Sequence, residues 1–370
     1  MRFDWDAIDA ELRPILGGLP GLSIDRDHIE QLAAGVAAGR LRAASNRLRE
    51  SPEPAGPDDV DDLERVSEAQ RSRFTRIGGE AIARGQVAVA VLNGGMATRF
   101  GGAVKGTVEA FGSRSFLEIK LAQAHAQGPV PVLVMNSFAT HAATLAFLEA
   151  RDLTKDVHPF LQSVSLRLTP EGELFRTDDG ALSPYAPGHG DFPEALRRCG
   201  LLTRLAERGI RAVTLSNVDN LGAELDPQIV GYHLAHERPV TIEVSGSVPG
   251  DVGGAPARVG NRLQVVEGFR FPAGYDFDRL RYFNTNTFVF SPAALETAYP
   301  LNWYYVEKQV EGRTAVQFER LVGEISAFVP AAYLAVPRGG RAGRYFPVKD
   351  QQALEALRAD RVLVERFSRR

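Results

Sequence analysis

Cysteine is almost absent from this chain of 370 residues, which contains only Cys199. A single thiol cannot form a disulfide within the chain, so a disulfide-stabilised scaffold is excluded and a reducing cytoplasm is the expected compartment. Cys199 lies in the amphipathic run LRRCGLL, which favours a structural role over a nucleophilic one.

Long apolar runs are also missing. No stretch approaches the roughly 20 apolar residues that a membrane-spanning helix needs. The opening sequence MRFDWDAIDAELRP carries acidic side chains early and has no apolar core, so it does not resemble a signal peptide. We therefore expect no membrane contact.

The chain has no excess of charge of either sign. Its 43 basic and 46 acidic side chains give a formal net charge of -3, which provides no general attraction to nucleic acid or to an anionic membrane. Any anionic ligand must therefore be held by a local site. The hydrophobic content of 44% is ordinary for a globular protein with a large core.

Apolar segments without polar alternation point to strands buried on both faces of a sheet. Residues 87–92 (VAVAVL), 131–135 and 212–215 have this character, and a helix is expected after each of the first two, at 115–126 and 140–149. This order predicts a doubly wound α/β sheet. Further strands are expected at residues 241–244, 263–266 and 288–290.

The segments before and after this core are expected to be mainly helical. Apolar residues recur at helical spacing from Ile8 to Ile15, and more helices are expected at 27–49, 61–83 and 351–367, with residues 51–57 as a linker. We therefore divide the chain into an N-terminal helical segment (1–84), an α/β core (85–335) and a short C-terminal segment (336–370).

A glycine-rich loop, LNGGMATRFGGAVKG, occupies residues 92–106. Glycines let the backbone approach a ligand, and successive N–H groups can then cradle phosphate, with Arg99 and Lys105 adding positive charge. The loop contains neither the GxxxxGK[ST] pattern of a P-loop nor the GxGxxG pattern of a dinucleotide-binding fold. Taken alone, it could equally be a surface loop with two solvated cations.

Other short motifs place polar groups at positions where ligands bind. His189, in PGHGD (187–191), can donate to a phosphate or hydroxyl, and Asp191 is expected to cap a helix starting near Phe192. Asp219, in SNVDNLGA (216–223), follows a buried strand, which favours Mg²⁺ binding over a capping role. The amides of FNTN (283–286) suit sugar hydroxyls.

Together these motifs resemble the UTP–glucose-1-phosphate uridylyltransferase family of sugar-nucleotide pyrophosphorylases. The matching segments run in the family's order from about Val87 to Asp350, and they include FLQS (160–163), QFE (317–319) and RYFPVK (344–349). The resemblance implies a Rossmann-like, GT-A-like nucleotidyltransferase core with a mixed sheet. Ala97 stands where the family has glycine and Val104 where it has proline, and the loop is one residue shorter.

The resemblance also implies the roles of individual residues. The resemblance assigns phosphate neutralisation and catalysis to Arg99, Lys105 and Lys349, and the binding of Mg²⁺ to Asp219. It assigns nucleotide binding to Leu92, Asn93, Gly94, Gly95, Thr98, Gln162 and Gly188, and within this set Gln162 would recognise uracil. It assigns sugar or phosphate binding to His189, Asn217, Asn284, Asn286 and Glu319.

The implied reaction joins UTP and a sugar 1-phosphate, releasing pyrophosphate. Asn93 together with FNTN favours glucose 1-phosphate over galactose 1-phosphate or N-acetylglucosamine 1-phosphate. A catalytically silent paralogue that binds UDP-sugars, motivated by Ala97 and the shortened loop, and a retaining glycosyltransferase are the alternatives. Many relatives continue into a β-helical assembly domain, whereas this chain stops soon after Lys349, so we expect a monomer or small homo-oligomer.

Overall fold

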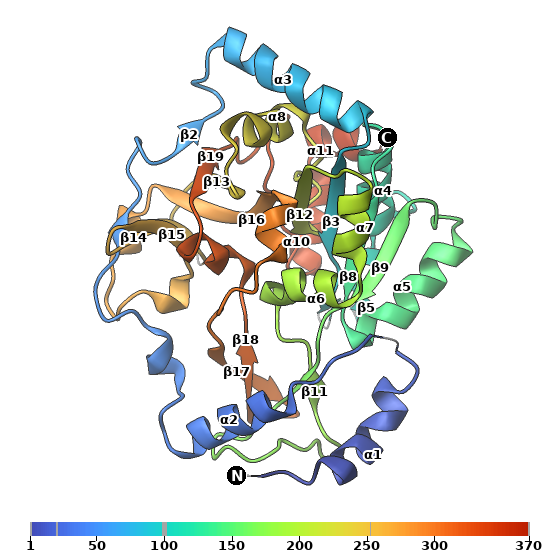
Figure 1. Ribbon diagram of the computed structural model, residues 1–370, viewed down its shortest axis with the longest axis vertical. Helices are drawn as coiled ribbons and strands as arrows, with labels where there is room; N and C mark the ends of the chain where they lie inside the picture. Colours follow the sequence, from blue (N-terminus) through green and yellow to red (C-terminus); the bar gives the residue numbers. More distant parts are fainter. Residues whose placement is uncertain (1, 20, 98–101, 252, 369–370) are drawn as a thin grey trace.

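An eight-stranded mixed sheet forms the centre of the protein (Figure 1). The structure is a computed structural model that describes residues 2–19, 21–97, 102–251 and 253–368. The strands, in spatial order, are β2 (Asp61–Asp62), β19 (Ala331–Ala335), β13 (Val240–Gly246), β16 (Tyr282–Phe290), β12 (Ala212–Asn217), β3 (Val87–Leu92), β8 (Val132–Asn136) and β9 (Val157–Leu161). Only β16 runs antiparallel to its neighbours within this sheet, so the predicted doubly wound mixed sheet is confirmed.

Strand β3 shows how the sequence builds a sheet that is covered on both sides. All six of its residues are buried; Val87, Val89 and Val91 face one apolar core, while Ala88, Ala90 and Leu92 face another. Since side chains alternate along a strand, an uninterrupted apolar run is what two buried faces require.

Helices cover both faces of the sheet and contribute side chains to its two apolar cores. The first core contains residues from α3 (Glu68–Ala83), α4 (Phe116–His125), α5 (Phe138–Ala150), α8 (Pro227–His236), α10 (Gln351–Ala359) and α11 (Arg361–Ser368). The second contains residues from α6 (Phe192–Arg198), α7 (Leu201–Glu207) and α9 (Pro292–Glu296). Within the described ranges, no helix combines the length and apolar character needed to cross a membrane.

The two N-terminal helices pack away from the main sheet. Helices α1 (Trp5–Leu16) and α2 (Arg26–Ala37) lie at the lower end of Figure 1, with α2 beside the strands β17 (Tyr304–Val310) and β18 (Arg313–Glu319). Their apolar residues contact Val164, Leu166 and Leu168, and α2 also contacts Val316 and Phe318 on β18. The N-terminal segment therefore supports strands that lead towards the carboxyl-end face of the sheet.

Short strands complete the fold. They are β1 (Glu53–Pro54), β14 (Ala255–Val259) and β15 (Arg262–Val266) in one sheet, and the pairs β4 (Met96–Ala97) with β5 (Ala103–Val104), β6 (Glu109–Phe111) with β7 (Arg114–Ser115), β10 (Ser165–Leu166) with β11 (Pro184–Tyr185), and β17 (Tyr304–Val310) with β18 (Arg313–Glu319).

Two N-terminal predictions were wrong because a turn or a strand replaces part of the expected helix. The helix expected at 27–49 ends at Ala37, since Gly39 adopts a left-handed φ of 67°. The helix expected at 61–83 starts only at Glu68, where Ser67 and Gln70 form a capping box. Asp61 and Asp62 instead pair with β19.

Two other expectations were also wrong. The expected linker at 51–57 contains Glu53 and Pro54, which pair with β14. The single helix expected at 351–367 is divided at Asp360, whose carboxylate accepts hydrogen bonds from the backbone N–H groups of Val362 and Leu363. A new N-terminal cap therefore interrupts a continuous amphipathic pattern.

Candidate active site

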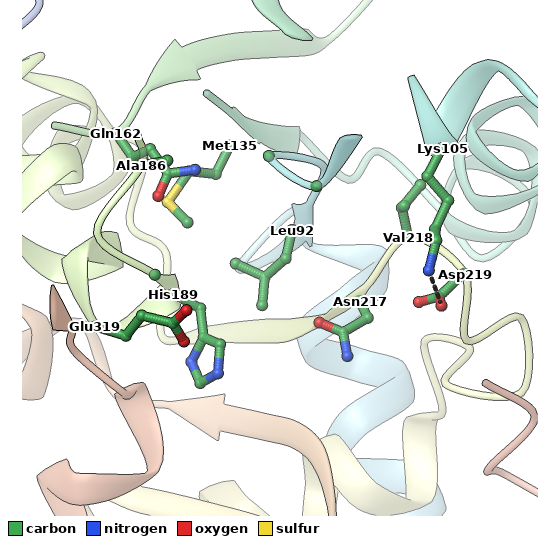
Figure 2. A pocket seen from close by; sticks show the side chains of 13 residues that line it. Leu92, Lys105, Met135, Gln162, Ala186, His189, Asn217, Val218, Asp219 and Glu319 are labelled. Atoms are coloured by element: carbon green, nitrogen blue, oxygen red, sulfur yellow. Dashed lines mark hydrogen bonds and ion pairs between the residues drawn. The ribbon is translucent and has the colours of Figure 1, made fainter. Parts of the chain in front are cut away.

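A cavity of about 380 Å³ lies at the carboxyl ends of the parallel strands β3, β8 and β12 (Figure 2). Such sheets bind ligands at this edge, and the volume is in the range of small-molecule sites. The lining residues are Leu92, Gly94, Gly95, Lys105, Met135, Gln162, Ala186, Gly188, His189, Asn217, Val218, Asp219 and Glu319.

A cation and a carboxylate meet at one end of the cavity. The Lys105 Nζ atom lies 2.8 Å from the Asp219 Oδ2 atom and 2.8 Å from the carbonyl oxygen of Val348. Figure 2 shows this pair on the opposite side of the cavity from His189 and Glu319, with Asn217 between them. Asp219 follows β12 by two residues, so the strand end and the glycine-rich loop together form the pair.

His189 provides a neutral hydrogen-bond donor at the other end. Its Nδ1 atom lies 3.1 Å from the backbone nitrogen of Val322, which donates to it, so the neutral ring carries its proton on Nε2. Burial lowers the pKa of His189 to about 4, despite the opposing effect of Glu319. At neutral pH this ring can therefore donate a hydrogen bond without adding charge.

Gln162 has an acceptor that no described residue satisfies. Its side chain is buried, and the Oε1 atom has no hydrogen-bond partner among the described residues. Its Nε2 atom would lie only 2.1 Å from a Cβ atom built on Gly94. The glycine therefore leaves the space that the glutamine amide occupies beside the cavity.

We expect Gly94→Ala to displace the Gln162 side chain and so to weaken any ligand contact that its amide makes. If the cavity holds the uracil that the resemblance implies, loss of about one hydrogen bond to that base predicts a KM for UTP raised on the order of tenfold, with a smaller change in kcat. Steady-state kinetics with varied UTP measure this effect. Gly79→Ala is the matched control, because a Cβ atom there also meets no atom within 4 Å and Gly79 lies on α3, away from the residues that line the cavity. An unchanged KM in Gly94→Ala contradicts the assignment.

Asp191 does not cap the helix that follows it, so this expectation was wrong. Its carboxylate is fully buried; it accepts hydrogen bonds from the backbone N–H and hydroxyl of Ser163 and pairs with the Arg320 guanidinium. A buried charge needs such partners. Asp191 thus ties the Gln162 loop, the His189 loop and the Glu319 strand together.

Asp191→Ala is expected to lower the free energy of unfolding by about 3 kcal/mol, because it leaves a largely buried arginine without its buried partner. Glu194→Ala is the matched control, since Glu194 pairs with the same Arg320 but is 46% exposed. Its loss is expected to cost at most about 1 kcal/mol. Urea denaturation measures both values, and equal losses would contradict the proposed role of burial.

Neighbouring side chains hold Glu319 towards the cavity. The Gln317 Nε2 atom donates to the Glu319 Oε1 atom at 2.7 Å, and Arg167 donates to the Gln317 Oε1 atom at 3.0 Å. Lys308 lies 3.7 Å from the same carboxylate. This chain of donors fixes an acceptor at the end of the site that lies away from Lys105.

The asparagines suggested by the sequence lie at different depths. Asn286, at φ 54°, donates through Nδ2 to the Asn217 Oδ1 atom at 3.1 Å, and Asn284 accepts from the Asn286 backbone. Asn93 is buried beneath the loop and donates to Asn136 and Thr144. Of these, only Asn217 lines the cavity.

The other candidate residues are placed as follows. Leu92, Gly94, Gly95 and Gly188 line the cavity, whereas Lys349 is exposed and directly follows Val348, whose carbonyl accepts from Lys105. Thr98 and Arg99 lie outside the described residues. The cavity also has walls that the sequence did not single out: Met135, Ala186 and Val218. Met135 could have been found as the end of a buried strand.

The fold and this site define an α/β protein with a cavity of small-molecule size at the carboxyl ends of its strands. Comparison with known families is consistent with that class. The chain belongs to the UTP–glucose-1-phosphate uridylyltransferase family, which it matches over residues 44–367.

Individual relatives agree with this assignment. The UTP–glucose-1-phosphate uridylyltransferases of Solanum tuberosum and Astragalus penduliflorus are each 29% identical, over 74% and 76% of this chain and 61% and 64% of their own length. The chain thus spans less than two thirds of these relatives.

A solved structure has the same fold. A mutant of UDP-glucose pyrophosphorylase from Leishmania major, in complex with UDP-glucose, superposes with a TM-score of 0.74 at 22% identity, covering 97% of this chain and 80% of its own.

Proposed function

We propose that this protein is a uridylyltransferase that forms a UDP-sugar, in the first place UDP-glucose, and pyrophosphate from UTP and a sugar 1-phosphate. The observation that carries the proposal is the convergence of Lys105, Asp219, Gln162 and His189 on one cavity. The family assignment and the names of the relatives support it.

The reaction is a direct displacement. An oxygen of the sugar 1-phosphate forms a bond to the α-phosphorus of UTP, and the bond from that phosphorus to the oxygen bridging to the β-phosphate breaks, so that pyrophosphate leaves. A phosphate monoester is already a competent nucleophile and needs no general base. Catalysis then consists mainly of alignment and charge neutralisation. Lys105, Lys349 and Arg99 supply positive charge, and Gln162 contacts the base.

The proposed metal is Mg²⁺, with Asp219 as the protein ligand. No group of three or more His, Cys, Asp or Glu side chains in the described ranges could hold a metal ion. One carboxylate is nonetheless suitable for Mg²⁺, which commonly takes one or two carboxylates together with substrate phosphates and water. When bound, the ion would offset phosphate charge.

We assign the sugar to the end of the cavity bounded by Glu319, His189 and Asn217. These groups offer an acceptor, a neutral donor and an amide, which suit the hydroxyls of an uncharged hexose. Asn286 holds Asn217, so the FNTN segment would act partly through its neighbour. Galactose 1-phosphate and N-acetylglucosamine 1-phosphate remain alternative substrates.

A pyrophosphate-release assay across UTP, CTP, ATP and GTP and a panel of sugar 1-phosphates tests the proposal. We expect turnover with UTP and glucose 1-phosphate in the presence of Mg²⁺. Binding of UDP-glucose in calorimetry without turnover would instead identify a silent UDP-sugar-binding paralogue. Sugar transfer to an acceptor without pyrophosphate release would identify a glycosyltransferase.

We further propose that the division at residues 84 and 335 separates a supporting helical segment, the catalytic core and a C-terminal segment that carries Lys349. The single cysteine favours a reducing, cytoplasmic location. A monomer or small homo-oligomer is the proposed assembly, and analytical ultracentrifugation tests it.

A further inference from the structure

The side chain of Asn220 joins two segments that are distant in the sequence. Its Nδ2 atom donates to the carbonyl oxygen of Arg344 at 3.0 Å, and its Oδ1 atom accepts from the backbone N–H of Phe346 at 2.9 Å. Asn220 is 1% exposed. One amide therefore satisfies a donor and an acceptor of the 344–348 backbone, as a neighbouring strand would.

Further contacts hold the same segment against strand β13 and against the loop of Asn220. The Arg344 guanidinium forms two hydrogen bonds to Glu243, at 2.6 and 2.8 Å, and both side chains are buried. A Cβ atom on Gly222 would lie 2.7 Å from the carbonyl carbon of Arg344, so only glycine allows this close approach. At its far end the segment accepts a hydrogen bond from Lys105 at the carbonyl oxygen of Val348.

The residues on either side of these contacts belong to the proposed site. Asp219 directly precedes Asn220, and Lys349 directly follows Val348. The amide of Asn220 thus lies between the loop that carries the carboxylate and the segment that carries the exposed lysine. Lys105 bonds to both sides, to the Asp219 carboxylate and to the Val348 carbonyl.

We propose that Asn220 is a positioning residue that fixes Lys349 relative to Asp219. The C-terminal segment is thereby held in place at the end of the cavity where Lys105 and Asp219 would bind phosphate. This inference rests on the proposed function. Asn220 is not among the residues that line the cavity, and its amide bonds to the backbone of residues 344 and 346. A displacement of about 1 Å in an aligned site can lower the rate on the order of a hundredfold. Loss of the Asn220 amide is therefore expected to displace Lys349 and to lower the rate.

The test is a double-mutant cycle between Asn220→Ala and Lys349→Ala, read as kcat and KM for pyrophosphate release. Gln123→Ala is the matched control. Gln123 is also buried, and its amide donates to the carbonyl of Leu221 at 3.1 Å, so it holds the same loop without a hydrogen bond to residues 344–348 in the described structure.

Asn220→Ala is expected to lower kcat on the order of tenfold to a hundredfold, with a smaller change in KM. In the Lys349→Ala background, the same substitution should have almost no further effect, because the group that it positions is gone. Gln123→Ala should act equally in both backgrounds. If Asn220→Ala lowers kcat by the same factor with and without Lys349, the positioning role is wrong and Asn220 is only structural.

Hydrogen exchange supplies a readout that does not depend on activity. The amide of Phe346 donates to Asn220, so exchange in residues 345–348 should speed up in Asn220→Ala and stay unchanged in Gln123→Ala. Unchanged exchange in Asn220→Ala would overturn the inference. Absence of pyrophosphate release from the wild-type protein would instead contradict the proposed function, while the exchange result would still decide whether Asn220 docks the segment.

Discussion

Lys105→Ala is expected to lower kcat/KM for pyrophosphate release by about 10²–10³-fold, comparable to the loss of an oxyanion-stabilising donor. Lys105 lines the cavity, its side chain is only 23% exposed, and its ammonium already lies beside Asp219. A positive charge held in such a partly desolvated place interacts strongly with phosphate. The measurement is steady-state kinetics with UTP and glucose 1-phosphate.

A matched lysine separates this effect from a general change in charge. Lys155 is exposed on the loop after α5, so Lys155→Ala changes net charge equally but should leave the rate within a factor of about two. Urea denaturation checks that both variants remain folded. If Lys105→Ala and Lys349→Ala both retained near-wild-type rates, the proposed mechanism would be wrong.

The central sheet could be predicted because its strands are buried on both faces. The apolar run at 87–92 has no other ready interpretation, and the helix starting after Ser115 shows its capping box directly in the sequence through Glu118. The pairing of Leu92 with Asn217 across β3 and β12 was not accessible from periodicity. Residues so distant in the sequence become neighbours only through the sheet order, which neither the periodicity nor the resemblance specified.

Errors arose where a long-range partner outweighed a local rule. Asp191 before a helix looks like a cap, yet its carboxylate pairs with Arg320, which lies 129 residues away. A buried carboxylate is stabilised more by a guanidinium than by exposed helix N–H groups. The same applies to Asp61, which was assigned to a helix by its spacing but pairs as a strand with β19.

The proposed site shows the same difference between local motifs, which the sequence reveals, and long-range contacts, which it does not. Gln162, Gly188 and His189 were found as parts of short motifs, because glycine and amide chemistry are visible locally. The contacts that hold them were hidden: those of Asp191 to Ser163, and those of Asn220 to the C-terminal segment, join residues from different elements. Sequence patterns reveal groups that face a ligand, whereas the groups that position them become visible only in three dimensions.

Asp219→Asn is expected to lower turnover by about 10²–10³-fold, by removing the charge that the proposed Mg²⁺ needs while keeping the size of the side chain. The substitution also removes the ionic partner of Lys105, which lies 2.8 Å from the Asp219 Oδ2 atom. Since hard divalent ions bind carboxylates far better than amides, half-maximal activity should require much more Mg²⁺. Rates across a Mg²⁺ titration measure this shift.

Metal binding can be followed separately from activity with Mn²⁺ as the probe. Water-proton relaxation should report a ternary complex of wild-type protein, Mn²⁺ and UTP that Asp219→Asn weakens. Asp156→Asn is the control, because Asp156 also pairs with an arginine, Arg208, but is 40% exposed and does not line the cavity. Equal Mn²⁺ affinity in the wild type and in Asp219→Asn would show that the carboxylate serves only to hold Lys105. Asp219→Asn would then be expected to have no further effect in the Lys105→Ala background, because the group that the carboxylate holds is already gone.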